Sequence, residues 1–300
     1  MKRQIKPNKK LEAMTINESL GDVATHFMKS GSSYRPTSDL ETLADFRKRV
    51  LPEKHRGSDM SYDIWFNTNA KQTIHKWLYT DFLGNGIYLR VPSTPINDKL
   101  TKHIVESDIK IDEERCEKIV NNFHNKYTLG ANQKYYDKVI FLPGSNLLNK
   151  GKCVHWGRVK QAVDNGFIIK PHPITTKLWV ARLRLDFGEE NVLDKKAGGF
   201  ELLANCKECA TMPNSEMGLM ALMLDKQLSM VAHTKKDREK SILTYESLYY
   251  AIADTNAKQS LKKIFSAKNS GIIFSFDEDA EDRVNNYLNN FWDYMVIQEW

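Results

Sequence analysis

The sequence lacks the features that mark a membrane-spanning or secreted chain. No apolar run approaches the roughly 18–20 residues that a helix needs to cross a bilayer. The first ten residues are basic, but they contain no apolar core of the kind that a secretion signal requires. Internal repeats and low-complexity segments are also absent. We therefore expect a globular protein without a transmembrane segment, located in the cytoplasm.

Cysteine is scarce, with four residues in a chain of 300, and this excludes a disulfide framework. Cys206 and Cys209 have the CxxC spacing of some zinc and redox sites. A structural zinc site needs a second pair of ligands at comparable spacing, and the chain offers none. We interpret both residues as structural thiols, partly buried at the start of a strand.

Charge is unevenly distributed along the chain, whose formal net charge is +6. Residues 1–57 contain 12 Lys and Arg against 7 Asp and Glu, a net charge of +5, whereas residues 138–300 contain 22 against 20. The basic N-terminal part favours a polyanionic partner, either nucleic acid or the anionic face of a membrane. A basic tail without any partner is an equally good interpretation.

Short apolar runs alternate with helical patterns between residues 138 and 233. The runs cover residues 139–142, 167–169 and 209–212, and a helical pattern at 217–224 precedes residues 227–231. This alternation predicts a doubly wound parallel sheet, in which ligands bind beyond the carboxyl ends of the strands. Residues 178–187 fit either a helix or a strand, and we favour a helix because Thr175 and Thr176 can cap it.

The pattern before residue 138 is weaker. It predicts strands at 62–66 and 86–91 and helices at 39–50, 70–83 and 112–123. A last helix is predicted for residues 277–300. We interpret the chain as an α/β protein with two Rossmann-like doubly wound domains, 1–137 and 138–300, which face a cleft and are closed by the C-terminal helix.

The first chemical motif follows the run at 139–142. Gly144, Ser145 and Asn146 open a turn, and Lys152 lies further along. A glycine lets the backbone approach a ligand, and amides at a helix start favour an anion. An ordinary strand-to-helix turn is the alternative. The segment is not a P-loop, because Asn149 stands where the second glycine would be needed.

The second motif is Lys170-Pro171-His172-Pro173, at the end of the next run. The prolines hold the backbone extended and stop the sheet ladder, so we expect His172 to point into the crevice. Lys170 and an imidazole can both contact a phosphate or a leaving oxygen. A lone histidine is more often structural, but this position favours a functional one.

The third motif, Ser215-Glu216, opens a helix after a strand. A serine N-cap and a carboxylate in the first turn both suit a helix start, and capping alone is one interpretation. The other is that Ser215 binds phosphate or ribose and Glu216 accepts the ribose hydroxyls. Asp277-Glu278-Asp279 matches the DxD pattern of metal-dependent transferases. We interpret it as a solvated, dipole-complementing helix start and predict no metal.

In this order, the three motifs resemble the nucleotide-binding half of GT-B glycosyltransferases. The turn at 170–173 is similar to the HP motif of bacterial sialyltransferases and capsule-polymer enzymes. Residues 141–146, followed by Lys152 and Trp156, are similar to the first C-terminal-domain strand of heptosyltransferase-like enzymes. The resemblance covers residues 138–235. It implies a nucleotide-sugar donor, UDP- or CMP-linked, bound between two Rossmann domains without an obligatory metal or other cofactor.

The resemblance also implies roles for individual residues. The turn at 18–23 is similar to the Gly-Asp turn of heptosyltransferase-like enzymes, so Asp22 would be the general base, although it can equally cap a helix at 23–29. His172 would stabilise the departing nucleotide. The donor would be held by Gly144, Ser145, Asn146, Lys152, Lys170, Ser215 and Glu216.

We therefore predict a glycosyltransferase. The predicted acceptor is a hydroxymethylated base in phage DNA, for example hydroxymethylcytosine receiving glucose or arabinose, which would place the enzyme in the host cytoplasm. A bacterial surface glycan, such as lipopolysaccharide or capsule, is an alternative acceptor. A nucleotide-binding or nucleic-acid-binding protein without catalytic activity is the alternative from a different class.

Overall fold

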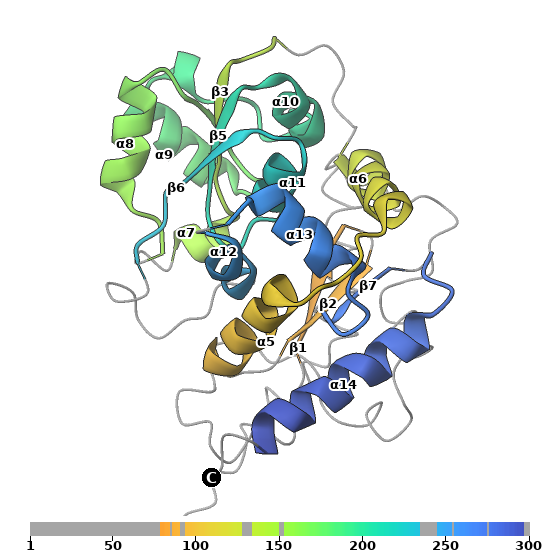
Figure 1. Ribbon diagram of the computed structural model, residues 1–300. Coiled ribbons are helices and arrows are strands. Elements are labelled where there is room, and N and C mark those ends of the chain that lie inside the picture. The colour runs from red at the N-terminus through yellow and green to blue at the C-terminus, as the bar shows by residue number, and fades with distance from the viewer. Residues whose placement is uncertain are drawn as a thin grey trace, which may run out of the picture.

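In the computed structural model, the described residues form two β-sheets (Figure 1). The structure describes residues 79–84, 86–90, 94–127, 134–149, 153–234, 245–253, 255–274 and 276–296. Asp22, Lys152 and the elements predicted before residue 70 lie outside the described residues.

The larger sheet is parallel, as the sequence predicts. Its strands are β3 (Lys138–Phe141), β4 (Ile168–Lys170), β5 (Glu208–Thr211) and β6 (Gln227–Met230), in the order β4-β3-β5-β6. Val139 and Cys209 belong to one hydrophobic cluster and Ile140 and Ala210 to another. Successive residues therefore face opposite sides of the sheet. Continuous apolar runs are typical of strands that are covered on both faces.

Helices cover both faces of this sheet. One face carries α8 (Trp156–Asp164) and α9 (Lys177–Phe187), and the other carries α10 (Gly199–Asn205) and α11 (Glu216–Met223). A single turn, α7 (Ser145–Leu148), follows β3, and a 3-10 turn covers Glu189–Asn191. The expected helix at 178–187 is confirmed as α9, where the Thr176 hydroxyl accepts a hydrogen bond from Trp179 N.

The smaller sheet differs from the expected N-terminal Rossmann-like unit. Its strands β1 (Tyr79–Leu83), β2 (Gly86–Arg90) and β7 (Ile272–Phe274) pair antiparallel in the order β1-β2-β7. The predicted helix at 70–83 is wrong for residues 79–83. A tight turn, in which Gly84 has a φ of 60°, folds that segment back onto β2. A division at residue 138 does not separate the two sheets, because β7 comes from the C-terminal part of the chain.

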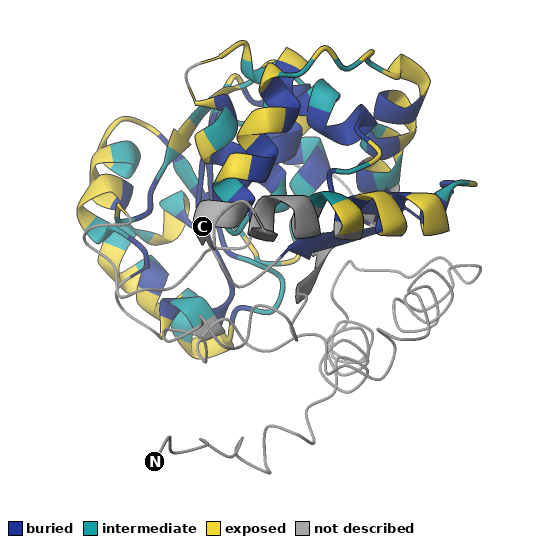
Figure 2. Ribbon diagram, turned by 60° about the horizontal axis from the view of Figure 1, so that its bottom comes forward, coloured by how far each residue is buried: buried dark blue, intermediate teal, exposed yellow. Residues whose placement is uncertain are grey.

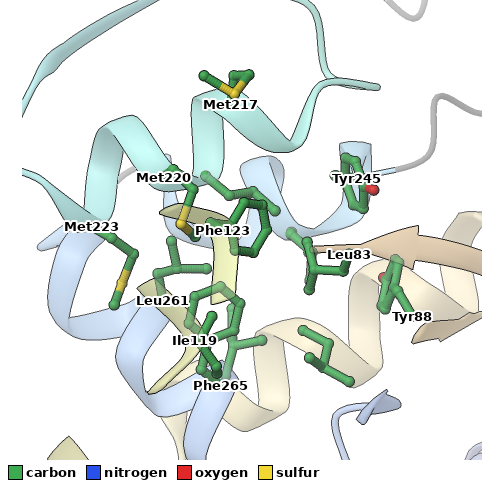
Figure 3. Close-up of a cluster of buried hydrophobic side chains, with 14 of the residues drawn as sticks. Leu83, Tyr88, Ile119, Phe123, Met217, Met220, Met223, Tyr245, Leu261 and Phe265 are labelled. Carbon is green, nitrogen blue, oxygen red and sulfur yellow. The ribbon is translucent and has the colours of Figure 1, made fainter. Parts of the chain in front are cut away.

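The other helices of the described residues join the two sheets through one core. They are α5 (Thr94–Glu106), α6 (Glu113–Tyr127), α12 (Glu246–Ile252), α13 (Ala257–Ser266) and α14 (Ala280–Val296). Figure 3 shows Phe123 of α6, Met220 of α11, Phe265 of α13 and Leu83 of β1 meeting in this core. Buried residues concentrate along the strands and the inner sides of the helices (Figure 2). No helix among the described residues combines the length and apolarity needed to cross a bilayer.

The DxD segment lies before the closing helix α14 and is engaged in ion pairs. The buried Asp277 carboxylate accepts hydrogen bonds from Arg115 Nε at 2.9 Å and Nη2 at 2.7 Å, and from Phe274 N at 2.7 Å. Asp279 accepts from Arg283 Nε at 2.8 Å. The sequence suggested that Asp277 is solvated, but in the structure it is buried. It joins α6 to β7 and to the start of α14.

Candidate functional site at the carboxyl edge of the parallel sheet

The strand order creates a topological switch point between β3 and β5. The chain passes from β3 to β4 on one side of the sheet, and from β5 to β6 on the other. In doubly wound sheets, ligands bind in the crevice outside the carboxyl ends of the strands at such a point. The loops that follow β3 and β5 flank it, and they carry Gly144 and Ser215.

The strands end at one level, so the loops after them emerge together. Phe141 pairs with Lys170, Ile140 with Ala210, and the last residue of β5 with the last of β6. His172 follows the end of β4 by two residues. The structure thus brings Gly144, His172 and Ser215 to a single edge of the sheet.

The loop after β3 is tied to the loop after β4. Gly144 is the N-cap of α7, with a φ of −67°, a value that any residue adopts. The Ser145 hydroxyl accepts a hydrogen bond from Thr176 N at 2.7 Å and donates one to Thr176 Oγ1 at 3.3 Å. Ser145 is buried. Its contacts therefore join two loops, where the sequence suggested a contact with phosphate. The side chain of Asn146 lies outside the described residues.

His172 is partly exposed within residues 171–176, which we call the His172 loop. Its Nδ1 accepts a hydrogen bond from Ile174 N at 3.3 Å, and its carbonyl accepts one from Thr175 N at 2.8 Å. An Nδ1 that accepts leaves the proton of a neutral imidazole on Nε2. The ring is partly exposed and does not lie in an apolar interior.

Lys170 contacts its own loop. Its side chain is 3% exposed, and its ammonium donates to Pro171 O at 2.7 Å and to Lys195 O at 2.8 Å. Burial lowers the pKa of Lys170 from 10.5 to about 7, while Asp194 raises it and Lys195 lowers it further. These carbonyls take the place of the phosphate contact that the sequence suggested.

Ser215 and Glu216 open α11. Ser215 is its N-cap, with the hydroxyl accepting from Met217 N at 3.3 Å, and its carbonyl accepts from Tyr249 Oη at 2.9 Å. Glu216 Oε2 accepts a hydrogen bond from Gly84 N at 2.7 Å, which anchors the β1–β2 turn to this helix start. The Glu216 carboxylate also places a negative charge where a phosphate was expected. A negative charge beside Ser215 therefore disfavours an anion at the start of α11.

Two histidines that the sequence did not single out lie near the end of β6. The rings of His155 and His233 stack with their centroids 4.6 Å apart. They meet because Val154 and Ala232 form an antiparallel bridge between the segment before α8 and the segment after β6. No local pattern could have revealed this pair, because the two residues are far apart in the sequence.

The CxxC residues have the structural role expected of them. Cys206 and Cys209 are both buried and free, and burial raises the pKa of each thiol. A thiol in this state is a poor nucleophile and a poor metal ligand. Within the described parts of the chain, no group of three or more histidine, cysteine or acidic side chains is arranged to hold a metal ion.

Comparison with known proteins gives no assignment. No protein-family description matches the chain, and no curated protein matches it significantly. The resemblance to GT-B glycosyltransferases therefore depends on the motifs and on the edge of the sheet where they lie.

Proposed function

We propose that the protein is a nucleotide-sugar-dependent glycosyltransferase whose donor binds at the carboxyl edge of the parallel sheet. One observation carries the proposal. The loops holding Gly144, His172 and Ser215 leave neighbouring parallel strands at one level, and two of them flank the switch point. This is where a doubly wound sheet binds a nucleotide.

The chemistry that these groups support is stabilisation of a leaving nucleotide. The acceptor hydroxyl attacks the anomeric carbon, the bond from that carbon to the phosphate oxygen breaks, and the nucleotide leaves with the electron pair. By the resemblance, His172 would stabilise the charge that develops on the phosphate. By the resemblance, Asp22 would take the proton of the acceptor hydroxyl. This GT-B arrangement also needs an acceptor domain, which we assign to the N-terminal part.

For the acceptor we propose a hydroxymethylated base in phage DNA. The support is the net charge of +5 in residues 1–57, which favours a polyanion. The same charge would also suit the anionic face of a membrane, where a surface glycan is assembled, so the two acceptors are separated by experiment. Retention on duplex DNA should then fall steeply with salt, because phosphate contacts release counterions. Salt-insensitive binding to lipid vesicles would instead favour the surface glycan.

The proposal is tested by donor use and by one substitution. The purified protein is incubated with UDP-, CMP-, GDP- and ADP-sugars and with unmodified or hydroxymethylated DNA, and the DNA is analysed by mass spectrometry. His172→Gln should lower transfer by about 10²-fold, as for loss of one donor to a developing anion. His103→Gln, at an exposed position of α5, is the matched control and should leave transfer unchanged.

Two results would contradict the proposal. The first is that none of the donors is hydrolysed or transferred and none raises the thermal unfolding temperature. A donor that binds but is never consumed, by contrast, would identify the protein as a non-catalytic nucleotide-binding protein. The second is that His172→Gln and His103→Gln retain equal transfer activity.

A further inference from the structure

We propose that the protein forms a weak dimer with a second copy of itself, in which two copies of α9 pack antiparallel around a twofold axis. The contact surface is the outer face of α9. It consists of the exposed residues Lys177, Leu178, Ala181, Arg182, Leu185 and Asp186. The dimer goes beyond the proposed function and does not depend on it. Three features of the structure support it.

The first feature is apolar surface on the outer face of α9. Leu178 is 80% exposed and Leu185 is 86% exposed. The two residues are seven positions apart, which is about two helical turns, so they lie on one side of the helix. The other side packs on the parallel sheet through the buried Leu183. A single exposed leucine is ordinary, whereas aligned apolar residues are typical of a contact surface.

The second feature is the order of the residues, which suits a twofold axis. When the axis passes between Ala181 and Arg182, Leu178 of one helix lies opposite the partner's Leu185. The same contact occurs twice, because an isologous interface repeats every contact. The small side chain of Ala181 next to the axis allows the two helices to approach closely. One short segment therefore supplies both halves of an apolar contact.

The third feature is the position of the charges at the two ends of this face. Lys177 is the first residue of α9 and Asp186 lies in its last turn. A cation at the start of a helix and an anion near its end are both unfavourable for the helix dipole. In the antiparallel pair, Lys177 lies opposite the partner's Asp186, so each charge gains an opposite one.

The same charges specify a second copy as the partner. Asp186 already accepts a contact from Arg182 Nε at 3.4 Å, and the lysine of the other copy would join this exposed ion pair. Complementary charges set the register of an interface and disfavour other partners. The outer face of α9 extends over about three helical turns. Such an interface is smaller than the standard size, so we expect a dissociation constant above about 1 µM.

The test is sedimentation velocity of the full-length protein, from about 1 µM to about 1 mM. The wild type should change from monomer to dimer across this range. Lys177→Glu places like charges opposite each other at two points of the dimer, and it should weaken dimerisation about tenfold or more. Asp186→Lys should have the same effect. The double variant Lys177→Glu/Asp186→Lys should dimerise again, because opposite charges face each other once more.

A control variant separates this effect from a change in net charge. Lys102→Glu, at an exposed position of α5, changes the charge by the same amount and should dimerise like the wild type. Helices α5 and α9 lie well apart in the molecule (Figure 1). All of these variants should unfold at the wild-type temperature in dilute solution, because the replaced side chains are exposed.

The proposal is overturned if the wild type stays monomeric throughout, if Lys177→Glu and Lys102→Glu dimerise alike, or if the double variant does not recover. Association that continues beyond the dimer would reject the twofold pairing. In a monomeric protein, slow reaction of Leu178→Cys with a maleimide would show that another segment of the same chain covers the outer face of α9. Failure of the donor assays would leave all of these measurements unchanged.

Discussion

Replacing Lys170 with methionine should make the stability of the protein less dependent on pH above neutrality. In the unfolded chain the lysine has its ordinary pKa of 10.5, and in the folded protein burial lowers that pKa to about 7. Between these two values the unfolded chain holds a proton that the folded protein does not. The free energy of unfolding therefore rises with pH in this window. Below pH 7 both states are protonated, and the full cost of the buried charge remains.

The size of the effect follows from the shift. At ~1.4 kcal/mol per pKa unit, a fall from 10.5 to about 7 corresponds to roughly 5 kcal/mol. The side chain is 3% exposed, so solvent screening reduces this little. The free energy of unfolding of the wild type should rise with pH, relative to that of Lys170→Met, by ~1.4 kcal/mol per pH unit at its steepest. Below pH 7 the variant should be the more stable protein, because it no longer buries a charge.

The assay is urea unfolding followed by circular dichroism at pH 6, 7, 8 and 9. The wild type, Lys170→Met and Lys196→Met are compared at each pH. Lys196 is exposed, so its replacement should leave the pH dependence of the wild type unchanged. Parallel curves for the wild type and Lys170→Met would refute the reasoning, since they would mean that the Lys170 amine titrates alike in the folded and unfolded states.

Two further substitutions test contacts that position the site. Glu216→Ala removes the acceptor of Gly84 N and should destabilise the protein by about 1–3 kcal/mol, measured by urea unfolding. Asp277→Asn leaves the buried Arg115 guanidinium without its carboxylate and should cost about 3–5 kcal/mol, measured in the same way.

Each of these two substitutions has a matched control at an acidic residue in a similar position. Glu201→Ala, at the partly exposed start of α10, should change stability by less than about 0.5 kcal/mol. Glu278→Gln, at an exposed position beside Asp277, should also change stability by less than about 0.5 kcal/mol. Equal losses for Glu216→Ala and Glu201→Ala would show that the bond to Gly84 does not hold the β1–β2 turn. A stable Asp277→Asn protein would contradict the role of the buried ion pair.

The part of the fold that local patterns predicted well is the parallel sheet. Strands β3, β4 and β5 largely coincide with the apolar runs at 139–142, 167–169 and 209–212, which end in turn residues, and this pattern depends only on neighbouring residues. The helix α9 was ambiguous by spacing, and the Thr176 cap decided it correctly. The motif residues therefore lie at the expected edge, because the carboxyl ends of parallel strands always meet there.

The same local patterns failed where one spacing fits two structures. Apolar residues that end at Leu83 suit a helix, yet residues 79–83 form β1 because β2 follows at once through a tight turn. The pairing of β2 with β7 joins residues that are more than half the chain apart. Sequence patterns describe periodicity, and they do not identify a distant partner.

By itself, the sequence determined that a parallel sheet exists and which residues end its strands, because strand formation and turns are governed by residues close in the chain. Tertiary structure alone decided what those residues contact: Ser145 binds Thr176, Glu216 binds Gly84, and Lys170 turns to the carbonyls behind the His172 loop. Hydrogen bonds go to whichever partner packing brings within reach. The chemistry of this edge therefore depends on contacts between segments that only the folded chain places together.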